Sequence, residues 1–292
     1  MEDNTVMKKI LFGVFAATLL ATPAGADQHS GTLKKIKDSG TITIGYREQS
    51  NPFSFLDEAK KPVGYSIDLC QRVVNTVKSQ LGVSALKVNY VPLSAENRFG
   101  AVAEGTVDIL CGNSTNTLSR QKQVAFSNMT FVTGASFLVN SDSPVNDVKD
   151  FAGKSIGVVA GTSTESALAD EIKKHSLNTK IVTYTDHESA LAALESGKIV
   201  AYAADRVVLI GLGRNAKDPS KLLLADQLFT YEPYGLVFRR GDADFALAVN
   251  TALAETYRSG DIAKIYEKWF GAWGARPSKL LLAMYALNAL PE

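Results

Sequence analysis

Histidine and cysteine are scarce in this chain, which has three histidines (His29, His175 and His187) and two cysteines (Cys70 and Cys111) among 292 residues. These residue types are the usual ligands of structural and catalytic zinc, so their scarcity argues against a metal site. The two cysteines leave two interpretations open. An oxidising compartment permits one disulfide between them, and the alternative is two buried free thiols.

The sequence also lacks the short motifs that mark common catalytic sites. It contains no Gly-x-Ser-x-Gly elbow, no phosphate-binding loop of the Walker type and no His-Glu-x-x-His. Gly211 and Gly213 lack the strand–turn–helix context of a dinucleotide fingerprint, and no nucleophile has an obvious base beside it. We therefore expect no enzyme activity and no cofactor.

Charge of one sign is not in excess either. The formal net charge is +1, and charged residues make up 21% of the chain against 46% hydrophobic residues. A nucleic-acid-binding surface requires a clear basic excess, so no nucleic-acid partner is expected. The composition is that of a soluble globular protein.

The N-terminus has the three-part order of a secretory signal peptide. Lys8 and Lys9 supply the positive segment, and residues 10–22 form an apolar run that is too short to span a membrane. Pro23 ends this run, and small residues follow up to Ala26. The sequence predicts a signal peptide over residues 1–26, cleavage after Ala26 and a periplasmic mature protein.

Strand and helix patterns alternate along the rest of the chain, which predicts an α/β fold in two successive βαβαβ units. In both units we expect ligand-binding groups at the carboxyl ends of the strands. Ser66 is a candidate N-cap for the first long helix. The predicted strands are 41–46, 88–91 and 107–110 in the first unit, and 155–159, 180–183 and 199–203 in the second.

Two extended runs, 130–139 and 234–238, suggest that the chain leaves one lobe, builds a second and returns. Two crossings of this kind form a hinge about which lobes can close on a ligand. Two independent domains in series are the alternative, but no linker separates the units. The predicted boundaries are lobe one at 32–132 and 237–292, lobe two at 137–231, and hinge strands at 133–136 and 232–236.

Several motifs occur in an order that resembles a known family. They are DSGTITIG at 38–45, Pro52-Phe53, GYSIDL at 64–69, the segment 113–120 and VAFS at 124–127. This order resembles the periplasmic polar amino-acid-binding proteins of ABC transporters (solute-binding protein family 3), and within them the glutamate/aspartate-binding branch. The resemblance runs from about residue 32 to residue 273.

The resemblance implies the two-lobed fold of type II periplasmic binding proteins. In that fold each lobe is a central, mostly parallel sheet flanked by helices, and two extended hinge crossings join the lobes. It also implies that the protein is a monomer that captures glutamate or aspartate between its lobes and delivers it to the membrane permease of an ABC importer.

The resemblance further assigns the groups that hold the backbone of an amino acid. Arg120 and Thr115 match the positions that bind the α-carboxylate, and Ser163 matches the hydroxyl of the second lobe. Asp205 matches the carboxylate that binds the α-ammonium group. Asn113 stands where the family often has a small hydroxyl residue, and its carbonyl can accept from the ammonium group instead.

Three further positions match those that the acidic branch uses for the distal carboxylate: Arg47, Arg98 and His187. Two arginines in a cleft repel a cationic ligand, so the pattern favours an acidic one. An enzyme on the same fold is the alternative, because cyclohexadienyl dehydratases resemble these binding proteins. Asp205 and His187 are the candidates for the acid or base that such an enzyme requires.

Overall fold

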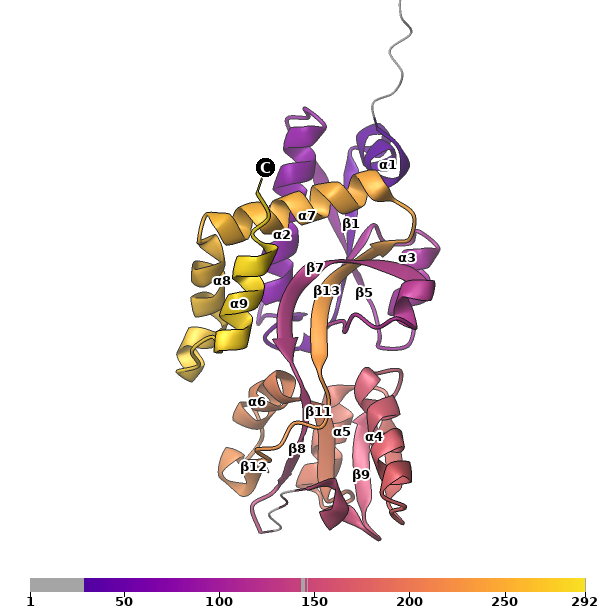
Figure 1. Ribbon diagram of the computed structural model, residues 1–292, viewed down its shortest axis with the longest axis vertical. Helices are drawn as coiled ribbons and strands as arrows, with labels where there is room; N and C mark the ends of the chain where they lie inside the picture. Colours follow the sequence, from indigo (N-terminus) through magenta and orange to yellow (C-terminus); the bar gives the residue numbers. More distant parts are fainter. Residues whose placement is uncertain (1–28, 143–144, 146, 292) are drawn as a thin grey trace, which may run out of the picture.

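The computed structural model describes residues 29–142, 145 and 147–291. The predicted signal peptide and its cleavage point lie outside the described residues. The described chain forms two lobes, one above the other in Figure 1, and two long strands run between them. The fold is therefore the predicted two-lobed α/β arrangement.

Lobe one is built on a sheet whose strands follow the order β5-β1-β6-β13-β7. The first three of these are parallel, and the fourth is antiparallel to both of its neighbours. The strands are β1 (Thr41–Tyr46), β5 (Lys87–Pro92), β6 (Ile109–Cys111), β7 (Val124–Thr133) and β13 (Glu232–Arg239). The helices are α1 (Gly31–Ser39), α2 (Tyr65–Gln80), α3 (Arg98–Ala103), α7 (Ala243–Arg258), α8 (Asp261–Phe270) and α9 (Lys279–Asn288).

Lobe two repeats this plan, with the strand order β10-β9-β11-β8-β12. Here too the first three strands are parallel, and the fourth is antiparallel to its neighbours. The strands are β8 (Ala135–Asn140), β9 (Ser155–Val159), β10 (Lys180–Tyr184), β11 (Ala201–Asp205) and β12 (Leu222–Leu224). The helices are α4 (Ser163–Lys174), α5 (His187–Glu195) and α6 (Arg206–Arg214).

The two sheets are linked at β7 and β13, which lie side by side and lead from lobe one toward lobe two (Figure 1). β7 ends at Thr133 in the first sheet, and β8 begins at Ala135 in the second. β13 begins at Glu232 and returns the chain to the first sheet. A small third sheet in lobe one contains β2 (Gln49–Ser50), β3 (Ser54–Leu56) and β4 (Pro62–Val63).

Aromatic rings dominate the core of lobe one. Phe53 makes edge-on contacts with Tyr65, Phe131 and Phe270 at centroid distances of 5.0–5.9 Å. Such pairs add to the free energy gained by burying apolar surface, which is the main force that holds the lobe together. α9 packs on this core, where the hydroxyl of its Tyr285 lies 2.8 Å from that of Tyr65. The apolar C-terminal segment thus belongs to lobe one.

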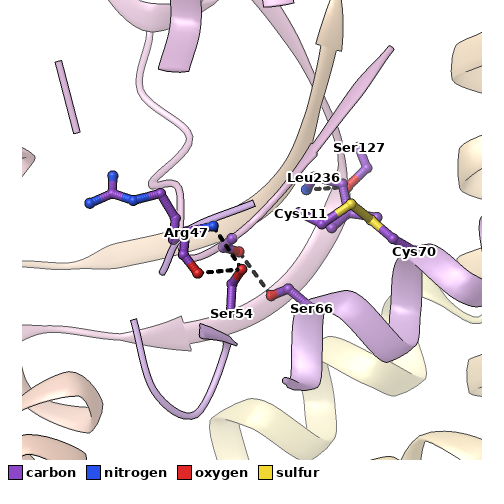
Figure 2. The surroundings of a disulfide bond; sticks show 8 residues. Arg47, Ser54, Ser66, Cys70, Cys111, Ser127 and Leu236 are labelled. Carbon is purple, nitrogen blue, oxygen red and sulfur yellow. Dashed lines mark hydrogen bonds between the residues drawn. A yellow bond between two sulfur atoms is a disulfide. The ribbon is translucent and has the colours of Figure 1, made fainter. Parts of the chain in front are cut away.

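A disulfide between Cys70 of α2 and Cys111 of β6 ties helix to sheet in the core of lobe one (Figure 2). Beside it, the Ser66 hydroxyl donates to the carbonyl oxygen of Gly112 (2.8 Å). The prediction that Ser66 caps α2 was wrong, because Gly64 holds the N-cap position with φ 137°, a conformation open mainly to glycine. Ser66 instead fixes the chain that follows β6.

Candidate functional site

A narrow cleft lies between the lobes, and the space in it that the centre of a water molecule can occupy is about 30 Å³. Side chains from the ends of both sheets line it, as expected for parallel strands that end at the same edge. All the residues that the sequence singled out as ligand-binding line this one cleft. Lobe one contributes Arg47, Arg98, Asn113, Thr115 and Arg120, and lobe two contributes Ser163, His187 and Asp205.

Arg47 is fixed through its backbone (Figure 2). Its N–H donates to the Ser54 hydroxyl oxygen (2.9 Å), and that hydroxyl donates back to the Arg47 carbonyl oxygen (3.1 Å). A side chain at Gly112 would stand only 3.1 Å from the Arg47 Cγ atom, so the glycine leaves room for the arginine stem. The guanidinium extends from this anchored backbone to the cleft.

The arginines of lobe one lie close enough together for their positive charges to affect the pKa of Arg98. Burial lowers the pKa of Arg98, and the charges of Arg47 and Arg120 lower it further. Burial also lowers the pKa of Arg47 to about 10. Because an arginine keeps its proton at neutral pH, these shifts reflect the cost of burying a guanidinium group and, at Arg98, of holding it beside two further cations. The arrangement favours an anionic ligand.

Arg98 also joins the lobes. It is only 5% exposed, and its guanidinium donates to the carbonyl oxygen of Ala95 in lobe one. A second N–H donates to the carbonyl oxygen of Gly161 in lobe two (3.2 Å). Arg120 is held within lobe one, where it donates to the carbonyl oxygen of Thr115 (2.9 Å). Both guanidinium groups lie over the ring of Phe99, at 4.4 and 4.9 Å from its centroid.

The wall from lobe two begins at the N-terminus of α4. Thr162 caps this helix, since its side-chain oxygen accepts from the N–H of Glu165 (3.2 Å). Ser163 and Thr164 form the first turn and line the cleft. The first N–H groups of a helix have no partner within the helix, so this turn offers donors to an anion.

Asp205 ends β11 and is buried in the cleft wall. Its carboxylate accepts hydrogen bonds from the Tyr234 hydroxyl and from the Thr164 hydroxyl (3.3 Å). Burial, and next the charge of Glu232, raise the pKa of Asp205 to about 7, although these hydrogen bonds and Arg120 act in the other direction. A cation beside this carboxyl group would favour its ionised form.

His187 begins α5 and is paired with a tyrosine. Burial, and next the positive charge of Arg47, lower the pKa of His187 to about 3, so the imidazole is neutral at physiological pH. Its Nδ1 atom is hydrogen-bonded to the hydroxyl of Tyr202, which has no other partner among the described residues. If the tyrosine donates its proton to Nδ1, the proton of the neutral imidazole stands on Nε2.

Sequence reasoning missed three residues of this site: Tyr202, Glu232 and Tyr234. Tyr202 faces the cleft from within β11, whose residues look like an ordinary buried strand in the sequence. Glu232 and Tyr234 lie at the start of β13, which the sequence marked only as an extended run. The available signal was Glu232 itself, a charged residue just before an extended run of the kind that is buried in a fold.

Two negative findings apply to the described part of the chain. No group of three or more His, Cys, Asp and Glu side chains there is arranged to hold a metal ion. Within the same residues, no helix is both long and apolar enough to cross a membrane.

Comparisons with known proteins agree with this geometry. Residues 42–272 match the family described as bacterial extracellular solute-binding proteins, family 3. An L-glutamate/L-aspartate-binding protein of Pseudomonas aeruginosa is 40% identical over 91% of this chain and 88% of its own length. A glutamate/aspartate import solute-binding protein of Salmonella typhimurium is 35% identical over 92% of this chain and 89% of its own.

A solved structure with a similar fold is that of an ancestral amino acid-binding protein, a precursor of cyclohexadienyl dehydratase. It is 27% identical, with a TM-score of 0.72 over 82% of this chain and all of that one. The family match covers most of the chain, and the fold and the cleft are those of a two-lobed receptor. The chain therefore belongs to the bacterial extracellular solute-binding proteins, family 3.

Proposed function

We propose that the protein captures glutamate or aspartate in the cleft. The observation that carries this proposal is the charge of the site, in which three guanidinium groups (Arg47, Arg98 and Arg120) line the cleft together with one carboxylate, Asp205, while a second carboxylate, Glu232, is buried near Asp205. An acidic amino acid brings two carboxylates and one ammonium group, so it can pair with the guanidinium groups and with the carboxylate of the cleft. A neutral amino acid would leave one guanidinium without an anionic partner, and a basic one would add a further cation.

Each group of the ligand has a partner in this proposal. Arg120 binds the α-carboxylate with its planar guanidinium, and the backbone N–H groups of the first turn of α4, which begins at Ser163, donate from the other side. Asp205 and the side-chain carbonyl of Asn113 accept from the ammonium group. The similarity to glutamate- and aspartate-binding relatives at 35–40% identity supports this choice of ligand.

The distal carboxylate lies between Arg47 and Arg98 of lobe one and His187 of lobe two. His187 is neutral, so it acts as a hydrogen-bond donor and not as a third charge. Because the two lobes supply different groups, the ligand gains its full set of contacts only in the closed form. Differential contact of this kind is what allows a ligand to shift an equilibrium between open and closed lobes.

The proposal extends to the cellular setting. A signal peptide over 1–26, cleaved after Ala26, would deliver a monomeric mature protein to the periplasm, where the closed form would meet the membrane permease of an ABC importer. The hinge would lie at 133–136 and 232–236, where β7 leads into β8 and where β13 begins. Lobe one would then comprise 32–132 and 237–292, and lobe two 137–231.

A thermal-shift screen of the twenty amino acids on refolded, ligand-stripped protein tests the proposal. Glutamate or aspartate should raise the melting temperature most. The acidic-ligand proposal fails if arginine, lysine or a large apolar amino acid gives the largest shift. A parallel incubation with prephenate or arogenate tests the dehydratase alternative, and formation of product would overturn the assignment as a receptor.

A further inference from the structure

Glu232 is a buried acid that the proposed ligand contacts do not use. It is the first residue of β13, is only 2% exposed, and is absent from the residues that line the cleft. A buried carboxylate has a high free-energy cost unless it is hydrogen-bonded. Its partners therefore indicate why the fold keeps it there.

Two hydroxyl groups, one from each lobe, meet on a single oxygen of this carboxylate. The Oε2 atom accepts from Thr115 of lobe one and from Ser163 of lobe two (2.8 Å). The two hydroxyl oxygens are also only 3.1 Å apart. Each hydroxyl carries one proton and an ionised carboxylate oxygen has two lone pairs, so both protons are satisfied by Glu232.

The backbone fixes one of these contacts and leaves the other to the relative position of the lobes. Thr115 forms an isolated β-bridge with Tyr234, and the next residue, Asn116, donates its N–H to the carbonyl oxygen of Pro233 (2.7 Å). Thr115 is thus paired to the start of β13 within lobe one. Ser163 lies in the first turn of α4 in lobe two, so its contact with the carboxylate depends on how lobe two is placed against the start of β13.

We propose that Glu232 is a positioning residue that joins the closed lobes by accepting the hydroxyl protons of both Thr115 and Ser163. The contact needs no ligand, so it stabilises the closed form in the ligand-free protein. It also means that neither hydroxyl has a proton left for a ligand carboxylate. The α-carboxylate must then be held by the Arg120 guanidinium and by backbone N–H groups of α4.

Solution scattering of the ligand-free protein tests the proposal without assuming any ligand. The Glu232→Ala variant should have a larger radius of gyration than the wild type, because the open form gains population. Glu255→Ala is the matched control: it removes the same charge from an exposed position on α7 and should leave the scattering unchanged. Equal radii for wild type and Glu232→Ala would overturn the proposal.

Two further variants separate a positioning role from a merely structural one. If Glu232 acts through the lobe-two hydroxyl, Ser163→Ala should open the ligand-free protein as well, and adding Glu232→Ala should then open it little further. Fully additive effects would contradict the proposal. The isosteric Glu232→Gln keeps the shape of the side chain and serves if the alanine variant does not fold.

Ligand binding adds a readout that rests on the proposed function. Glu232→Ala should weaken glutamate binding by about tenfold, the effect of losing a hydrogen bond to a charged group in the closed form. In Glu232→Gln the negative charge that raises the pKa of Asp205 is gone, so the pH dependence of binding should move to lower pH. If glutamate fails to bind even the wild type, the proposed ligand is wrong, whereas the scattering comparison still decides the role of Glu232.

Discussion

Lobe one and lobe two share a plan, a five-stranded sheet whose strands end at the cleft, yet they present different chemistry to it. Lobe one contributes three guanidinium groups, from Arg47, Arg98 and Arg120. Lobe two contributes a carboxylate, a neutral imidazole and the N-terminus of α4. The difference teaches that neither wall alone matches an amino acid that carries both signs of charge. The proposed capture therefore requires closure of the lobes, because the matching groups stand on opposite lobes.

The largest effect is expected from the cationic wall. Arg120→Ala should leave the ligand α-carboxylate without its charged partner, at a cost of about 3–5 kcal/mol. That cost corresponds to roughly two to four decades in Kd, to be measured by calorimetry. All amino-acid ligands should be lost together, because they share this group. Arg214→Ala, at an exposed position in lobe two, is the control. Near-normal binding by Arg120→Ala would place the carboxylate elsewhere.

The second effect concerns the disulfide, which lobe one has and lobe two lacks. The disulfide between Cys70 and Cys111 closes a loop with a sequence separation of 41 in lobe one, and the sequence holds no further cysteine for lobe two. Replacing both cysteines by alanine should lower the free energy of unfolding by about 2–4 kcal/mol in denaturant titrations. Thiol titration of the denatured, unreduced protein is the direct check. Two reactive thiols would show that the bridge does not form.

The third effect is a pH dependence that belongs to lobe two. Asp205, faced by Glu232, Tyr234, Thr164 and Arg120, has its pKa raised to about 7. The ligand ammonium group requires the ionised carboxylate, so the Kd for glutamate should rise by up to tenfold for each pH unit below about 7.

The ligand-free protein should respond to pH in the opposite sense. A raised folded-state pKa stabilises the fold fully below the unfolded value near 4, and this contribution is lost as the pH rises through 7. Thermal unfolding measured with and without glutamate across pH 4–8 (a range of about four units) tests both trends. Asp205→Asn should flatten them, and unchanged trends in that variant would assign the titration to another group.

The smallest effect is expected at the hydrogen bond between Tyr202 and the imidazole of His187. Tyr202→Phe removes the hydroxyl that is hydrogen-bonded to Nδ1 of His187 and should cost about 0.5–1.5 kcal/mol in glutamate affinity. Nitrogen-15 NMR of the imidazole should show a proton on Nε2 in the wild type and a mixture of tautomers in the variant. Tyr257→Phe is the control, because it removes a buried hydroxyl that donates to the Met129 carbonyl oxygen in lobe one. A wild-type imidazole protonated on Nδ1 would contradict the role given to Tyr202.

Much of this molecule was predictable because its signals are local. The strands 41–46 and 155–159 have the predicted bounds, since their apolar runs and the turn residues beside them mark them clearly. The strand predicted at 199–203 lies at Ala201–Asp205, so Asp205 stands inside the strand end and not beyond it. Boundaries shift in this way because pairing with neighbouring strands, and not the local sequence, decides where a strand ends.

The predicted residues meet at one cleft because each follows or begins an element at the same edge of a sheet. The residues that hold these cleft-lining side chains in place were not predictable in the same way. The contact of Glu232 with Ser163 joins residues 69 positions apart in the chain and in different lobes. No periodicity or motif reports such a contact, since it depends on how the lobes close.

The central claim is that the two lobes bind oppositely charged groups of the ligand. The most direct test asks whether the ammonium group of glutamate is bound by Asp205 of lobe two. Glutarate has both carboxylates of glutamate but lacks the ammonium group, so calorimetry of the two ligands isolates that group. The account predicts that wild type prefers glutamate by about 100-fold, the worth of a buried charge-assisted contact of roughly 3 kcal/mol. Asp205→Asn should lose most of this preference, while Arg120→Ala should weaken both ligands alike. An Asp205→Asn variant that keeps the full preference would contradict the division of charges between the lobes.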